Sequence, residues 1–67
     1  MKEKLCKALE ARYNSKKEEA LATLSVYFNN PAGIGEHPQI VDEMDKMVEQ
    51  YTNANDCLKA IQELKNE

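Results

Sequence analysis

The two prolines and two glycines of this chain all lie between positions 31 and 38, so two long segments contain no helix breaker. Both segments are rich in Lys, Glu, Leu and Ala, which favour helices. We therefore predict an all-α fold with one helix over about 2–29, a loop over 30–37 and a second helix over about 38–66. With 67 residues, the chain forms a single domain over 1–67.

The second segment carries the clearest periodicity. Its apolar residues alternate four and three positions apart, which is typical of the a and d positions of a heptad seam. Three further apolar residues, Val41, Val48 and Leu64, widen this stripe, as expected where a helix meets more than one neighbour. The seam consists of Ile40, Met44, Met47, Tyr51, Ala54, Leu58 and Ile61, with Lys65 at the next position.

The first segment has apolar residues at helical spacing, interrupted by the polar run 14–19. These residues are Leu5, Leu9, Tyr13, Ala20, Leu21, Leu24 and Phe28. A short loop forces neighbouring helices to be antiparallel, so facing residue numbers should sum to about 68. This register predicts an interhelical core in which Phe28 faces Ile40, Leu24 faces Met44, Leu21 faces Met47, Leu9 faces Leu58 and Leu5 approaches Ile61 and Leu64.

The same register places the polar run 14–19 opposite the polar run 52–56, and this region is here called the waist. The tyrosines at its edge are expected to belong to the core, where their hydroxyl groups can find partners. If a small molecule binds, the waist is the favoured place, with basic side chains contacting phosphate. The candidate ligand contacts are Arg12, Tyr13, Lys16, Lys17 and Tyr51.

A chain of this size buries only about 60% of the surface of its unfolded state, so a single hairpin is marginally stable. One hairpin would also leave part of each apolar stripe exposed. We therefore predict that the antiparallel two-helix hairpin assembles into a four-helix-bundle dimer or a higher oligomer. The predicted oligomer interface is Ile40, Val41, Met44, Met47, Val48, Tyr51, Leu58, Ile61 and Leu64.

The loop is expected to have a defined structure. Pro31 disfavours helical geometry at the residue before it and so ends the first helix. Gly33 and Gly35 allow backbone angles closed to other residues. Pro38 suits the first position of a helix, which leaves His37 near the N-cap. Ile34, between the glycines, is expected to cover the end of the bundle.

The run Asn30-Pro31-Ala32-Gly33-Ile34-Gly35-Glu36-His37, followed by Ile40-Val41-Asp42-Glu43-Met44, resembles a segment of small uncharacterised helical proteins of large T-even-type tailed phages. The resemblance extends over about two-thirds of the chain, and the loop is its distinctive part. The family has no assigned activity, so no catalytic residue follows from it. The resemblance implies an accessory phage protein that acts in the cytoplasm of the infected host or is packed in the particle.

The residue types required for catalysis or metal binding do not occur in the required patterns. His37 is the one histidine, and the cysteines, Cys6 and Cys57, belong to no C-x-x-C or Cys/His cluster. The register places the two cysteines out of reach of a relaxed disulfide, so both are expected to be reduced. We predict no enzyme activity, no cofactor and no metal.

Charge divides the chain unevenly. Residues 1–17 carry six Lys or Arg against two Glu, whereas residues 18–67 carry three Lys against ten Asp or Glu. The basic segment lacks an aromatic cluster or a base-reading motif, so a solvated helix face is favoured over nucleic-acid binding. No signal peptide or membrane span is expected, which favours a cytoplasmic protein.

These observations favour a non-enzymatic, homo-oligomeric interaction protein, such as a phage adaptor, inhibitor or minor structural protein with a host protein as partner. Two alternatives remain open. One is an oligomer that sequesters a small nucleotide or metabolite at the helix interface, and the other is a weak nucleic-acid binder.

Overall fold

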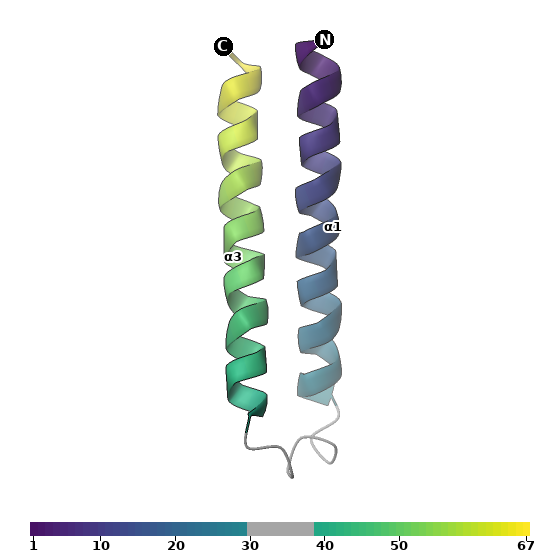
Figure 1. The fold of residues 1–67 in the computed structure, drawn as a ribbon, viewed down its shortest axis with the longest axis vertical. Helices are drawn as coiled ribbons and strands as arrows, with labels where there is room; N and C mark the ends of the chain where they lie inside the picture. The colour runs from purple at the N-terminus through teal and green to yellow at the C-terminus, as the bar shows by residue number, and fades with distance from the viewer. Residues whose placement is uncertain (30–38) are drawn as a thin grey trace.

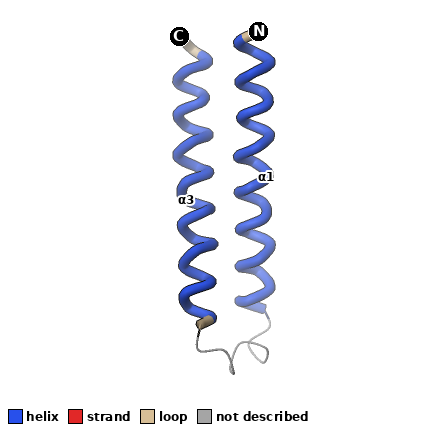
Figure 2. Tube along the Cα trace, viewed as in Figure 1, coloured by secondary structure: helices blue, strands red, loops and turns tan. Residues whose placement is uncertain are grey.

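The computed structural model describes residues 1–29 and 39–67. Helix α1 spans Lys2–Asn29 and helix α3 spans Ile40–Lys65. The helices lie side by side and antiparallel, with both chain termini at the same end (Figures 1 and 2). All regular structure in the described ranges is helical, so the predicted two-helix, all-α architecture is confirmed. Helix α3 begins two residues later than the sequence predicted, and Gln39 precedes it without a side-chain cap.

Contacts across the hairpin define the register. The Gln50 side-chain amide donates a hydrogen bond from Nε2 to the Lys16 carbonyl oxygen at 2.8 Å. Near the termini, Lys2 Nζ donates to the Glu67 carbonyl oxygen at 3.2 Å. Both pairings agree with the predicted rule that facing residue numbers sum to about 68.

The predicted seam of α3 is the face that meets α1. Ala54 and Ile61 are buried, with 0% and 4% of their surface exposed. The other apolar seam residues of this helix are half-buried: Ile40, Met44, Met47, Tyr51 and Leu58. The alternation of four and three residues therefore identified the inner face of this helix correctly.

The predicted apolar stripe of α1 is wrong in four of its seven members. Leu5, Leu9, Leu21 and Phe28 are exposed, at 58%, 39%, 39% and 65% respectively. Ala20 and Leu24 are buried and Tyr13 is half-buried, as predicted. The residues facing α3 alternate four and three positions apart, as in the seam of α3. They are the buried Cys6, Ala20 and Leu24, with the half-buried Glu10, Tyr13, Lys17 and Tyr27.

This difference has a physical cause. Glu10 and Lys17 occupy seam positions of α1, and a search for apolar residues passes over them. Long polar side chains can lie in a half-buried position when their charged ends reach the edge of the helix pair. Lys65 Nζ lies 3.0 Å from Glu10 Oε1, and Lys17 Nζ lies 6.0 Å from the centre of the Tyr51 ring. Both seam residues therefore find a partner.

The helix pair is long and thin, with principal extents of 49, 14 and 13 Å. Its radius of gyration is 15.3 Å, whereas a compact domain of this length has about 11 Å. Its accessible surface is 5256 Å², against about 4300 Å² for a typical folded monomer of this mass. The hairpin therefore exposes more surface than a compact domain of equal size.

The predictions made for the loop fall outside the described residues. They concern Pro31, Gly33, Ile34, Gly35, His37 and Pro38. The first turn of α3 carries Asp42 and Glu43, which interact favourably with the positive end of the helix dipole.

Candidate functional site

The waist brings aromatic side chains of both helices together with cationic side chains of α1. Tyr13 and Lys17 occupy the seam of α1, and Tyr51 occupies the seam of α3; all three are half-buried. Lys16 Nζ lies 5.6 Å from the centre of the Tyr13 ring, and Lys17 Nζ lies 6.0 Å from that of Tyr51. These distances are within the range of cation–π attraction, which places two ammonium groups beside two aromatic rings.

The Gln50 side chain of α3 contacts the backbone of α1 at the waist. Its hydrogen bond to the Lys16 carbonyl crosses from α3 to α1 at 2.8 Å. A carbonyl oxygen has two lone pairs and can accept this bond in addition to its bond within the helix. The contact holds Lys16 at a fixed height against α3.

Tyr13 takes part in a second polar contact between the helices. Its hydroxyl group lies beside the Cys57 side chain, whose thiol is 4.0 Å from Asn53 Oδ1. Interaction with Cys57, through hydrogen bonding and through the charge of a thiolate, raises the pKa of Tyr13 above its usual 10.0 together with burial, although Arg12 acts in the opposite direction. The neutral phenol is therefore the form that this site favours.

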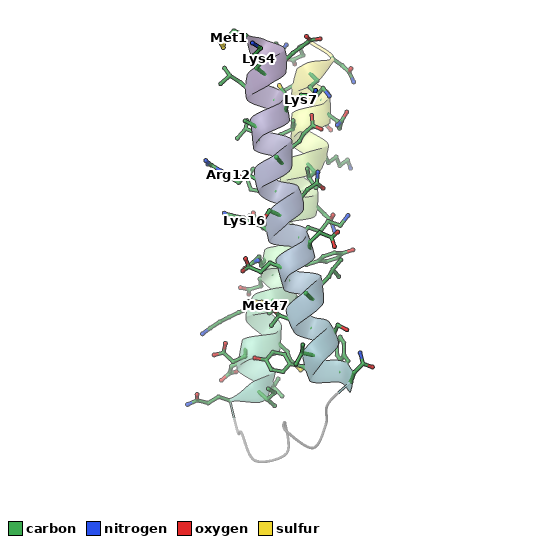
Figure 3. All side chains as sticks on the ribbon, turned by 90° about the vertical axis from the view of Figure 1, so that its right-hand side faces the viewer. Met1, Lys4, Lys7, Arg12, Lys16 and Met47 are labelled. Atoms are coloured by element: carbon green, nitrogen blue, oxygen red, sulfur yellow. The ribbon has the colours of Figure 1, made fainter. Side chains whose placement is uncertain are left out.

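Arg12 lies at the edge of this cluster. Figure 3 shows Arg12 and Lys16 projecting from the same edge of α1, and both are exposed. Four of the predicted ligand contacts therefore lie together: Tyr13, Lys16, Lys17 and Tyr51. The fifth, Arg12, lies one helical turn from Lys16. The cluster can attract an anion and offer aromatic faces, but among its described side chains we find no nucleophile paired with a general base.

The predicted oligomer interface divides into two groups. Ile61 is buried within the hairpin, and Ile40, Met44, Met47, Tyr51 and Leu58 are half-buried there. The remaining three residues are accessible: Val41 at 70% exposure, Val48 at 48% and Leu64 at 52%. Exposed Leu21 and Phe28, which the sequence analysis placed in the core, add apolar surface that it did not foresee.

A second feature escaped the sequence analysis. An open hollow of about 340 Å³ lies near the termini, lined by Glu3, Lys4, Lys7 and Lys65. The basic composition of residues 1–17 was visible in the sequence. The approach of Lys65 from the far end of the chain follows only from the hairpin.

No group of three or more His, Cys, Asp or Glu side chains within residues 1–29 and 39–67 is arranged to hold a metal ion. Neither α1 nor α3 contains a stretch long and apolar enough to cross a membrane.

Comparison with known proteins found no matching family model, no matching curated protein and no matching solved structure.

Proposed function

We propose that this chain is a non-enzymatic helical protein that self-associates and acts by binding another protein. The main support for this proposal is that few apolar side chains are buried in the hairpin, whereas many large ones are exposed. In the described ranges, the buried apolar residues are Cys6, Ala20, Leu24, Ala54 and Ile61. The large exposed ones are Met1, Leu5, Leu9, Leu21, Val26, Phe28, Val41, Val48 and Leu64.

The buried set is too small for a robust independent core. Two of its members are alanines, whose side chains bury little area, and burial of a leucine or isoleucine supplies only about 1.5–3 kcal/mol. Helical structures of this size usually require a disulfide, a metal, a partner or exceptionally good packing. Both cysteines are free. In this proposal, self-association buries the exposed apolar residues and so stabilises the fold.

The biological setting of the proposal is an accessory role in a phage-infected cell, as an adaptor, inhibitor or minor structural protein. This part rests on the resemblance of the loop at 30–37 to small proteins of T-even-type phages. The host protein partner would be found by affinity capture from host lysate, with retention compared between the wild-type chain and a variant of one exposed apolar residue.

Self-association is tested by light scattering coupled to size-exclusion chromatography at micromolar concentration. The expected mass is twice the 7.6 kDa of one chain or a higher multiple. A helical species with the mass of a single chain would contradict the proposal. Circular dichroism measured on the same fractions separates a folded monomer from an unfolded chain.

The waist favours one second candidate function, the sequestering of a small phosphorylated ligand such as a nucleotide. The supporting observation is the placement of the Lys16 and Lys17 ammonium groups beside the rings of Tyr13 and Tyr51. A thermal-shift panel of nucleotides tests it. Stabilisation by a nucleotide that is lost on combining Arg12→Ala with Lys16→Ala supports the function, and an unresponsive panel excludes it.

A further inference from the structure

The two flanks of the helix pair differ. One flank is bridged by the Gln50 side chain, which reaches the Lys16 carbonyl. The opposite flank is formed by the e positions of the heptad, each of which follows a d position of the seam. We call it the open flank, and its residues are Lys7, Asn14, Leu21 and Phe28 on α1, with Val41, Val48, Asn55 and Gln62 on α3.

The half of the open flank near the ends Asn29 and Ile40 is apolar. In an antiparallel helix pair, e positions of one helix face e positions of the other, so Leu21 lies level with Val48, and Phe28 with Val41. Their exposures are 39%, 48%, 65% and 70% in that order. Four large apolar side chains from two helices therefore form one exposed patch.

Charge on the open flank is separated by sign. We consider the e positions together with the outer b positions beside them. In the apolar half, the charged residues at these positions are Glu18 and Asp45, both acidic. In the half near the termini, they are Lys4, Lys7 and Lys59, all basic, and Lys4 and Lys7 also line the hollow.

We propose that the open flank is the surface on which a second copy of this chain docks, with the two hairpins antiparallel to one another. This inference rests on the proposed self-association and names its surface and orientation. In this arrangement, the apolar and acidic half of each copy lies against the basic half of the other, and one two-fold axis generates both contacts. A parallel arrangement would instead place Lys4 and Lys7 against Lys59 of the other copy, which is electrostatically unfavourable.

The hollow gives Phe28 a specific place in this dimer. Phe28 and Lys7 both occupy e positions, three heptads apart, so they lie on the same flank about 32 Å from each other at 1.5 Å per residue. Reversing one hairpin against the other brings the Phe28 ring of each copy to the hollow lined by Glu3, Lys4, Lys7 and Lys65. Lysine stems can cover an aromatic ring while their ammonium groups interact with its face.

The available area suits this occupant. The chain exposes 5256 Å², which exceeds the surface of a typical monomer of its mass by about 1000 Å². A standard protein interface buries about 800 Å² on each partner. A second hairpin lying along most of the 49 Å length would bring the exposed area of each copy close to that of a compact protein.

Two matched substitutions test the surface. Phe28 and Val26 lie two residues apart on α1 with similar exposures of 65% and 61%, but Val26 is not on the open flank. We expect Phe28→Glu to raise the dimer dissociation constant at least about tenfold, because a charge opposes burial at the interface. Val26→Glu should leave it within about twofold of wild type. Sedimentation equilibrium measures both, and equal effects of the two substitutions would overturn the proposed surface.

Charge reversal tests the orientation. The two-fold axis that brings Phe28 to Lys7 lies level with residues 17 and 18 of α1, so Lys59 of each copy lies close to the level of Asp45 of the other. In the antiparallel dimer, Lys59→Glu therefore brings two acidic groups together, and its dissociation constant should rise about tenfold. Adding Asp45→Lys to the same chain should restore wild-type affinity. In a parallel dimer, Lys59 would instead lie near Lys4 and Lys7 of the other copy, so Lys59→Glu would tighten the dimer, and this result would overturn the orientation.

The outcomes separate this inference from the function on which it rests. A wild-type chain that is a folded monomer contradicts self-association itself. A wild-type dimer that survives Phe28→Glu but dissociates on Leu9→Glu or Leu64→Glu keeps self-association and overturns the open flank. If Phe28→Glu unfolds the chain, the charge reversals at the exposed positions still test the proposal, since restoration by the double variant Lys59→Glu/Asp45→Lys requires the proposed contact.

Discussion

Glu10 of α1 and Lys65 of α3 form an ion pair across the hairpin, with Lys65 Nζ 3.0 Å from Glu10 Oε1. Both residues occupy a positions of the seam, where a coiled coil usually carries apolar side chains. A polar pair in a seam contributes little stability. The two residue numbers sum to 75, seven more than the sum of about 68 for facing residues, so the two long side chains reach toward each other along the helix axis.

The first prediction concerns the energy of this ion pair. The side chains of Glu10 and Lys65 are 23% and 38% exposed, so solvent screens the attraction. A double-mutant cycle with Glu10→Gln and Lys65→Gln should give a coupling energy of about 0.5 kcal/mol in urea unfolding, decreasing at 1 M salt. Lys46 and Glu43 form a longer, more exposed pair of 3.5 Å on one helix and serve as control. A larger coupling for the control pair would contradict the assignment.

The second prediction tests the close approach of the helices at the waist. Ala54 is completely buried in the seam of α3, whereas Ala60 on the same helix is exposed. We expect Ala54→Leu to lower the free energy of unfolding by about 1–3 kcal/mol, because the larger side chain forces the helices apart. The same substitution at Ala60 should change it by less than about 0.5 kcal/mol. Chemical denaturation followed by circular dichroism provides both values.

The third prediction tests the corrected seam of α1. Leu24 is buried at 7% exposure, whereas Leu9, which the apolar pattern assigned to the same face, is 39% exposed. Leu24→Ala should destabilise the protein by about 2–3 kcal/mol, and Leu9→Ala by clearly less. If Leu9→Ala proved the more damaging in thermal unfolding, the apolar stripe and not the heptad seam would be the inner face.

The fourth prediction concerns the titration of Tyr13. The contact with Cys57 raises the pKa of Tyr13 in the folded protein above 10.0. Subtracting the phenolate absorbance of Tyr13→Phe from that of wild type gives the titration curve of Tyr13 alone. When both proteins also carry Cys57→Ala, the midpoint of this curve should move closer to 10.0. An unchanged midpoint would show that Cys57 is not the cause.

The direction of the associated pH effect follows from linkage. Because the folded state holds the Tyr13 proton more tightly than the unfolded state, this group stabilises the fold fully below pH 10.0. The contribution is lost as the pH rises through the raised pKa of the folded state. Wild type should therefore lose more stability than Tyr13→Phe when the pH is increased above 10.0, and thermal unfolding at matched pH values measures the difference.

Much of the fold follows from the sequence alone. The confinement of proline and glycine to positions 31–38 predicts two long helices, and the strict spacing from Ile40 to Ile61 predicts the inner face of α3. The register was also predictable, because the polar runs of the two segments match at one alignment. These are local or periodic signals, and a sequence displays them directly.

The inner face of α1 was decided by tertiary structure. In that helix, large apolar residues such as Leu5 and Phe28 outnumber those of the true seam, which includes Glu10 and Lys17. Polarity alone therefore favours the wrong face. Glu10 and Lys17 are acceptable in the seam because Lys65 and Tyr51 from the other helix lie within reach, and only the folded hairpin places those partners there.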